Sequence, residues 1–119
     1  MAESPISKSG GECTIDVRSE GDTVMVKCKG RLVFGQTGLL LDPLRDLLPK
    51  SRRVVIDLSE VSFMDSAGLG AVVRLYVSAK TSHCELQLVN LAPRVRELFG
   101  LARVLSVFEP YGEYNIRMP

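Results

Sequence analysis

The sequence predicts a single α/β domain built on a mixed, mostly parallel sheet of four to five strands. The chain has 119 residues, of which 45% are hydrophobic, and this suits one folded domain with a sizeable core. Val54–Leu58 form a short, nearly continuous apolar run, which is typical of a strand buried on both faces. Strand-like and helical patterns then alternate along the chain, and such alternation favours right-handed crossovers between parallel strands.

The first part of the chain predicts a tail and then a hairpin. Residues 1–11 are rich in Ser, Gly, Lys and Pro, so we expect a flexible N-terminal tail, with the domain over residues 12–119. Apolar and polar residues then alternate on both sides of the turn sequence EGD, with the apolar positions at Cys13, Ile15, Val17, Val24, Val26 and Cys28. This pattern predicts an antiparallel hairpin, followed by a glycine-containing loop over Gly30–Gly38.

A helix is expected over the leucine-rich segment that follows. Its apolar face comprises Leu40, Leu41, Leu44, Leu47 and Leu48, and Pro49 ends the pattern. Pro43 interrupts this face, because proline breaks the interior of a helix. Either the helix is kinked there, or it begins with Asp42 as N-cap and Pro43 at the first helical position.

The second half predicts two more helices and two more strands. After the buried strand, helical periodicity begins at Ser66 and reaches about Lys80. The predicted buried face of this helix comprises Leu69, Val72, Val73, Tyr76 and Val77. Glu85–Val89 alternate like a strand, Pro93 opens a third helix with Gly100 as its C-terminal cap, and residues 103–108 form a last short strand.

Charge and motifs exclude several classes of function. With 15 basic and 14 acidic side chains the net charge is +1, so we expect no nucleic-acid partner. The sequence has no run of 18 apolar residues, and its first residues show no apolar core followed by a cleavage site, so we expect no membrane insertion and a cytoplasmic location. Cys13, Cys28 and Cys84 lack CxxC spacing and are expected to be reduced core thiols. No cofactor or metal motif is found, so we expect neither.

The sequence leaves the role of Ser66 open. A serine nucleophile needs a general base, but His83, the only histidine, lies beyond a helix on the order of 22 Å long. The hydroxyl could instead cap the helix. It could also accept a phosphoryl group, because Ala67, Gly68, Gly70 and Ala71 leave room for a partner there. A charge of about −2 within such an interface would oppose binding.

The stretch VVIDLSEVSFMDSAGLGAVV, residues 54–73, resembles the core of the STAS domain, in particular that of bacterial anti-sigma factor antagonists, also called anti-anti-sigma factors. In that family a strand leads through a short polar link to DSSGLG or DSAGLG, which opens a helix. GRL at residues 30–32 and LAPRVRELFGLARV at residues 91–104 also resemble family segments. The resemblance implies a single STAS-like domain, with its helices mainly on one face of a mixed sheet.

The resemblance also implies a function. The chain would be no enzyme but an antagonist that binds an anti-sigma factor, which is also a serine kinase, and so frees a sigma factor for transcription. Phosphorylation of Ser66 would end this binding, and a PP2C-type serine phosphatase would restore it. The antagonist would be a monomer or weak dimer. Its expected contact residues are Gly30, Arg31, Val33, Phe34, Phe63, Met64, Asp65, Ser66, Ala67, Gly68 and Leu69.

One departure from the family and two alternatives bear on this expectation. In antagonists the loop usually reads GELD or GRLD, whereas here the apolar pair Val33 and Phe34 follows Leu32, so the docking surface is expected to be more hydrophobic. The first alternative is a non-switching STAS scaffold subunit of a stress-sensing or membrane-transporter complex, in which Ser66 only caps its helix. The second is direct binding of a nucleotide or a small apolar ligand at the same helix N-terminus.

Overall fold

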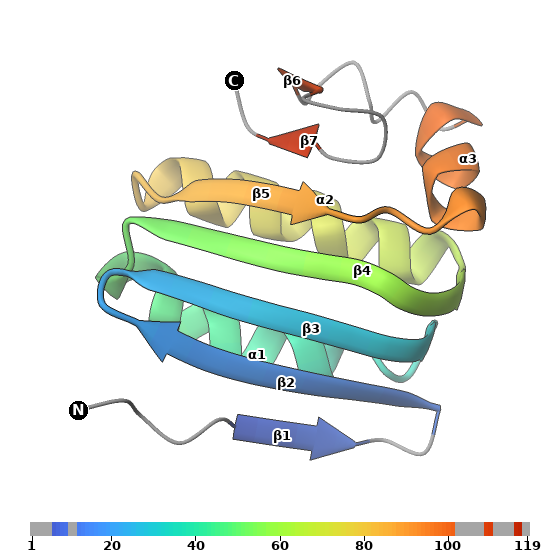
Figure 1. Ribbon diagram of the computed structural model, residues 1–119, viewed down its shortest axis with the longest axis horizontal. Helices are drawn as coiled ribbons and strands as arrows, with labels where there is room; N and C mark the ends of the chain where they lie inside the picture. Colours follow the sequence, from blue (N-terminus) through green and yellow to red (C-terminus); the bar gives the residue numbers. More distant parts are fainter. Residues whose placement is uncertain (1–5, 10–11, 102–108, 111–115, 118–119) are drawn as a thin grey trace.

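The computed structural model describes residues 6–9, 12–101, 109–110 and 116–117, and shows one sheet with α1 and α2 packed behind it and α3 at its edge (Figure 1). The strands are β1 (Ile6–Ser9), β2 (Cys13–Glu20), β3 (Thr23–Leu32), β4 (Arg53–Met64), β5 (Glu85–Val89), β6 (Glu109–Pro110) and β7 (Ile116–Arg117). The helices are α1 (Gly38–Leu47), the short 3-10 helix η1 (Leu48–Lys50), α2 (Ser66–Thr81) and α3 (Pro93–Leu101).

The sheet is mixed, and its centre is parallel. Within the described residues it has seven strands in the order β1-β2-β3-β4-β5-β7-β6. β4 lies between β3 and β5 and is parallel to both, whereas the outer pairs are antiparallel. The predicted fold class, the hairpin and the central position of Val54–Leu58 are therefore confirmed. The strand count exceeds the four to five expected, because short strands extend both edges.

Residues 6–9 correct the prediction of a flexible tail over residues 1–11. They form β1, which pairs antiparallel with β2 from Ile6 opposite Val17 to Ser9 opposite Thr14. Without β1, the outer edge of β2 would present unpaired backbone N–H and C=O groups, and these pair with any extended segment nearby. Composition alone does not show that such an edge is available.

The other end of the chain departs from the predictions in a smaller way. The strand predicted over residues 103–108 lies outside the described residues. α3 does not stop before Gly100 but continues to Leu101, so Gly100 is not the residue that ends it. Val95 and Phe99 of α3 are buried in the core.

Helix α1 continues through Pro43, as the first of the two alternatives required, and does not start at it. Its first residue is Gly38, and Pro43 lies inside it, so the start at Asp42 is wrong. The proline ring has no N–H, which leaves the carbonyl of Leu39 without its usual helical donor. Burial of Leu40 and Leu44 against the sheet compensates for that loss, because the helix is stabilised by its packed face rather than by propensity.

Helix α2 covers the predicted residues, and its predicted face is confirmed at Val72 and in part at Leu69 and Tyr76, which pack against the core. Its buried residues are Gly68, Ala71, Val72, Leu75 and Ala79. Val73 and Val77, which were predicted to be buried, are 40% and 56% exposed. Small side chains carry a weak hydrophobic signal in the sequence, yet they let the helix axis come close to the sheet. Packing of these small residues, rather than of the larger valines, therefore determines which face of α2 lies on the sheet.

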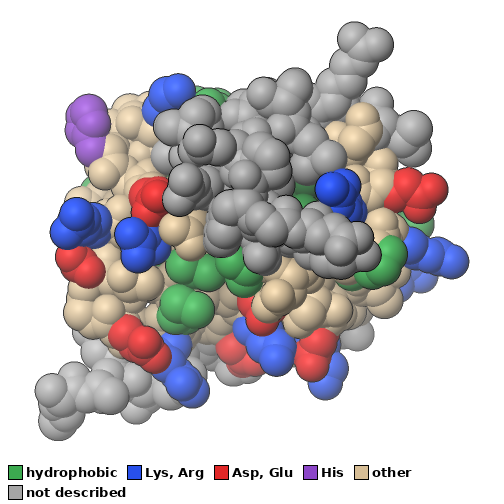
Figure 2. All heavy atoms as spheres, turned by 45° about the horizontal axis from the view of Figure 1, so that its top comes forward, with side chains coloured by type: hydrophobic (Ala, Val, Ile, Leu, Met, Phe, Trp, Pro, Cys, Tyr) green, Lys and Arg blue, Asp and Glu red, His purple; other side chains and the backbone are tan. Residues whose placement is uncertain are grey.

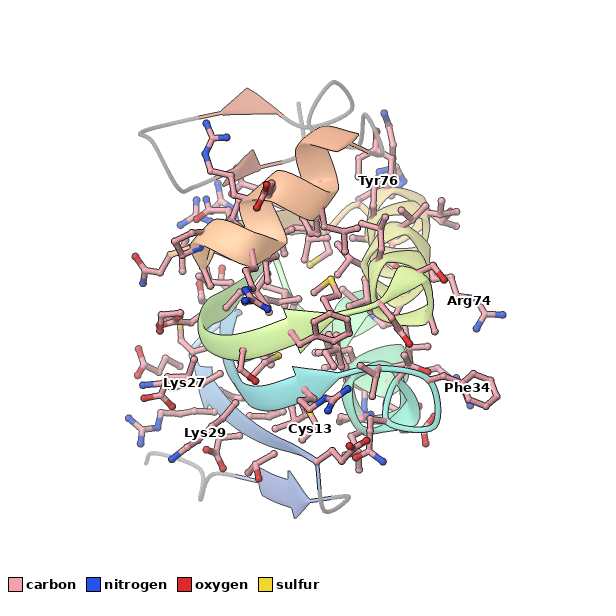
Figure 3. The ribbon with its side chains drawn as sticks, turned by 90° about the vertical axis from the view of Figure 1, so that its right-hand side faces the viewer. Cys13, Lys27, Lys29, Phe34, Arg74 and Tyr76 are labelled. Atoms are coloured by element: carbon pink, nitrogen blue, oxygen red, sulfur yellow. The ribbon has the colours of Figure 1, made fainter. Side chains whose placement is uncertain are left out.

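The two faces of the sheet differ in cover. α1 and α2 lie on one face, as the resemblance implied, and the core between them and the sheet includes Cys13, Cys28 and Cys84, all free thiols as predicted. Burial raises the pKa of the Cys28 thiol. Lys27 and Lys29 project from the opposite, open face (Figure 3). Seen from that side and the top edge, acidic and basic side chains are intermingled (Figure 2).

Candidate functional site

The candidate site lies where β3 and β4 end beside each other. These strands are parallel, with Arg31 opposite Phe63 and Leu32 opposite Met64, so their carboxyl ends meet at one edge of the sheet. The loop of residues 33–37 leaves β3 there toward α1, and Asp65 leads from β4 into α2. Segments about thirty residues apart in the sequence, both of which the sequence predicted as contact regions, are thus brought together.

Asp65 joins the two segments through its two carboxylate oxygens. Oδ1 accepts a hydrogen bond from the Gly68 N–H at 2.9 Å, which caps α2, and Oδ2 accepts one from the Phe34 N–H at 3.0 Å. The N-cap of α2 is therefore Asp65, and Ser66 is the first helical residue. This corrects the capping role considered for Ser66. Asp and Ser are about equally good N-caps, so their adjacency hid the choice.

The same contacts lower the pKa of Asp65. The backbone N–H of Phe34 contributes most and that of Gly68 next, because both stabilise the charged carboxylate. A group whose pKa is lower in the folded than in the unfolded state stabilises the fold above its unfolded pKa, about 3.9 for Asp. That contribution is lost as the pH falls through the lowered value.

Asp65→Ala is expected to lower the free energy of unfolding by about 1 kcal/mol at neutral pH, since it removes the cap and the tie to the loop. Asp65→Asn keeps a capping oxygen and serves as the control, with a smaller loss. Chemical denaturation at several pH values measures both. The gap between wild type and Asp65→Ala should close as the pH drops below about 3.9. A gap that is independent of pH would contradict the role assigned to the carboxylate.

Two glycines allow the close approach of the backbones around Asp65. A Cβ atom on Gly68 would meet the carbonyl oxygen of Leu32, and would lie 2.7 Å from Cγ of Met64. Gly30 has φ +97°, and a Cβ there would meet the carbonyl oxygen of Glu12. Both positions therefore require glycine, which is a structural reason for their presence in the site.

Aromatic and cationic side chains cover the outside of this junction. Phe34 is 84% exposed at the tip of the loop, and Phe63 is 40% exposed. The guanidinium of Arg31 lies over the Phe63 ring, 5.3 Å from its centroid, and Arg31 Nε is 3.9 Å from Oε1 of Glu12. These contacts fix Arg31 and Phe63 relative to each other, while Phe34 is tied through its backbone only.

The hydroxyl of Ser66 is exposed at the N-terminus of α2, beside these aromatic residues. Ser66 begins α2, whereas His83 follows its C-terminal end. The imidazole of His83 is therefore too far away to act as a general base for Ser66. Within the described part of the chain, no group of three or more His, Cys, Asp or Glu side chains could hold a metal ion.

The structure divides the predicted contact residues by accessibility. Val33, Met64 and Gly68 are buried and support the site from within. The others are exposed or partly exposed: Gly30, Arg31, Phe34, Phe63, Asp65, Ser66, Ala67 and Leu69.

Sequence patterns did not point to Glu12, which pairs with Arg31, or to Arg74, which is exposed on α2. An exposed arginine in a helix that has no acidic residue was the available signal for Arg74.

Two hollows flank the start of α2. One, of about 540 Å³, lies toward α3 and is lined by Phe63, Met64, Asp65, Arg94, Glu97 and Leu98. The other, of about 430 Å³, lies toward α1 and is lined by Thr37, Leu41, Ala67, Gly70, Ala71 and Arg74. The surface is therefore concave on both sides of the segment that a partner protein would cover when it binds at Ser66.

Comparison with known proteins shows which family this chain resembles. The family model for the STAS domain matches residues 14–115. A STAS-domain containing protein of Pseudomonas aeruginosa is 25% identical over 91 residues, which are 76% of this chain and 90% of that protein. The anti-sigma-B factor antagonist of Listeria monocytogenes is 41% identical over 63 residues, or 50% of this chain and 55% of that protein.

A solved structure shows the same fold. The anti-sigma factor antagonist SpoIIAA in its unphosphorylated form superimposes with a TM-score of 0.68 at 19% identity, over 76% of this chain and 81% of that one. Within the described residues, the helices of this chain are too short or too polar to cross a bilayer. The match of the family model over residues 14–115, together with the shared fold, shows that the chain belongs to the STAS domain family.

Proposed function

We propose that this protein is an anti-sigma factor antagonist whose binding to an anti-sigma factor is switched off by phosphorylation of Ser66. Relatives that carry this name, such as those of Listeria monocytogenes and Bacillus subtilis, support the general role. The kinase activity and its ATP belong to the anti-sigma factor, and a PP2C-type phosphatase reverses the step. This chain is then a substrate and regulator in the cytoplasm, not an enzyme, and acts as a monomer or weak dimer.

One observation carries the proposal: Ser66 is exposed, and its hydroxyl is not used as the helix cap. Asp65 performs the capping, so the hydroxyl of Ser66 is available to a kinase without loss of the α2 N-terminus. A phosphoryl group on the first helical residue also lies at the positive end of the helix dipole, which favours anions. The fold should therefore tolerate the modification well.

The surroundings of Ser66 explain how a tolerated phosphate can still prevent binding. The exposed rings of Phe34 and Phe63 offer the apolar contact area from which interface hot spots are built. A phosphate beside them adds about −2 charge next to the Asp65 carboxylate. A docked partner would have to desolvate this charge, at a cost of several kcal/mol unless it supplies a matching cation.

Incubation with the candidate anti-sigma factor kinase and ATP tests the proposal. We expect the mass of the chain to rise by one phosphoryl group, and Ser66→Ala to remain unmodified. Ser62, an exposed serine at the end of β4, offers the control, because Ser62→Ala should be modified like wild type. Modification of Ser66→Ala to the same extent, or none of wild type, would refute the switch and favour a scaffold role.

A further inference from the structure

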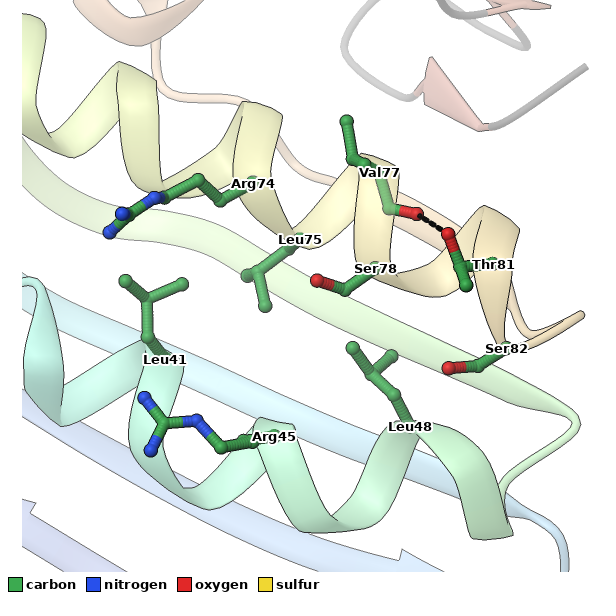
Figure 4. A pocket seen from close by; sticks show the side chains of 9 residues that line it. All are labelled: Leu41, Arg45, Leu48, Arg74, Leu75, Val77, Ser78, Thr81 and Ser82. Atoms are coloured by element: carbon green, nitrogen blue, oxygen red, sulfur yellow. Dashed lines mark hydrogen bonds between the residues drawn. The ribbon is translucent and has the colours of Figure 1, made fainter.

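A groove runs along the seam between α1 and α2, away from Ser66. Its far part, of about 470 Å³, is lined by Leu41, Arg45, Leu48, Arg74, Leu75, Val77, Ser78, Thr81 and Ser82 (Figure 4). It shares Leu41 and Arg74 with the hollow beside Ala67, so the two hollows adjoin each other at these side chains. The shared residues connect the surface around Ser66 with the middle of α2, about 12 Å further along the helix.

The floor of this groove, hereafter the α1–α2 groove, is apolar and its flanks are cationic. Leu41 lies between the guanidinium groups of Arg45 and Arg74 (Figure 4). Leu48 and Leu75 continue the apolar part, whereas the side chain of Val77 points away from α1 (Figure 4). Arg74 has no ion-pair partner in the described part of the chain, whereas Arg45 has Asp42 at 3.6 Å, an exposed pair that contributes little.

The charged side chains that line the groove are Arg45 and Arg74, whereas Asp42 and Asp46 of α1 are not part of its lining. α2 contains no acidic residue, and neither α1 nor α2 has one in its first turn, where helix dipoles leave a partial positive charge. Both helices follow parallel strands, so their N-termini lie at the same edge of the sheet as Arg31. Phe34 and Arg74 project on the same side of the molecule (Figure 3).

We infer that the α1–α2 groove is the docking site for an acidic amphipathic helix of the partner protein. The apolar side chains of that helix would pack on Leu41, beside Leu48 and Leu75, and its carboxylates would pair with Arg74 and Arg45. The hollow beside Ala67 and Gly70 adjoins the groove and lies next to the start of α2, which carries Ser66. Exposed Gly70, with no atom within 4 Å of a Cβ built on it, leaves the path open.

The inference rests on the proposed function and refines how the switch works. The position at which antagonists carry an acidic residue is Val33 here, and it is buried, so no carboxylate of the loop faces the partner. An acidic partner helix, which Arg74 and Arg45 favour, would be repelled by phosphoserine at position 66, and the phosphate would also resist desolvation. Binding should therefore weaken with rising ionic strength, because salt screens attraction between exposed charges.

Charge reversal at Arg74 tests the groove. With the kinase that modifies Ser66 as the probe, Arg74→Glu is expected to lower affinity at least about tenfold and to flatten its dependence on salt. Arg18→Glu makes the same charge change on an exposed residue of β2, on the open face of the sheet, and should change affinity less than about twofold. Circular dichroism of both variants should match wild type, because both side chains are exposed.

The outcomes separate this inference from the proposed function. Equal binding of wild type and Arg74→Glu would overturn the groove and leave the Ser66 switch intact. If no kinase binds wild type, the proposed function fails, and a synthetic amphipathic helix of leucine and glutamate becomes the probe, with a leucine and lysine twin as control. Changes in the NMR chemical shifts of the α1 and α2 amides that occur with the leucine and glutamate peptide, but not with its lysine twin, would support docking in the groove. Equal shifts with both peptides, or no shifts there, would overturn it.

Discussion

Gly68→Ala is expected to lower the free energy of unfolding by about 3 kcal/mol, because the added methyl group overpacks a closed site. A Cβ there meets the carbonyl oxygen of Leu32, which belongs to β3 and is not the flexible end of a side chain. Either α2 or the end of β3 must move. Movement at this point would also disturb the hydrogen bonds of Asp65, since Gly68 N–H is one of its two donors.

Gly70→Ala is the matched control, two residues further along the same helix. Nothing lies within 4 Å of a Cβ atom at Gly70, and the residue is helical and exposed. Alanine is a better helix former than glycine by about 1 kcal/mol, so stability should rise by up to that amount. Urea denaturation of the three proteins measures both effects. Equal stability of the two variants would contradict the close contact between α2 and β3.

Ser66→Asp is expected to lower the affinity for the anti-sigma factor at least about 100-fold, equivalent to about 3 kcal/mol. The added carboxylate lies beside Asp65 and must lose water when Phe34 and Phe63 are covered. The fold should not suffer, because an acidic residue in the first turn of a helix is stabilising by about 0.3–1 kcal/mol. Loss of binding with unchanged or higher stability is therefore the expected combination.

Ser66→Asn has nearly the same shape as Ser66→Asp without the charge, and it serves as the control. Its affinity should remain within a few-fold of wild type, as measured by isothermal titration calorimetry. An equal loss for both variants would show that size, not charge, opposes binding. Retained binding of Ser66→Asp would favour a STAS scaffold that does not switch.

The sheet could be predicted from the sequence because its signals are local and strong. The run Val54–Leu58 has apolar residues on both sides of the strand, and only a central strand buries both. The hairpin of β2 and β3 follows from alternation on both sides of a turn. β1 could not be predicted in this way, because an edge strand forms where a neighbouring strand has unpaired backbone groups, and it does not need a hydrophobic pattern of its own.

The candidate site was predicted in position but not in geometry. DSAGLG marked the start of α2, yet it could not show that Asp65 caps the helix while Ser66 remains available. The tie between Asp65 and the Phe34 N–H joins residues 31 apart in the sequence, and only the parallel register of β3 and β4 brings them together. The groove beside Arg74 depends on how α2 is rotated, which its small buried residues decided.

The most direct test of the switch is the affinity of one preparation for the same anti-sigma factor before and after phosphorylation of Ser66. The unmodified chain should bind, the fully phosphorylated chain should bind at least about 100-fold more weakly, and treatment with a PP2C-type phosphatase should restore the first value. Equal affinity in both states, with the phosphate located on Ser66 by mass spectrometry, would contradict the switch.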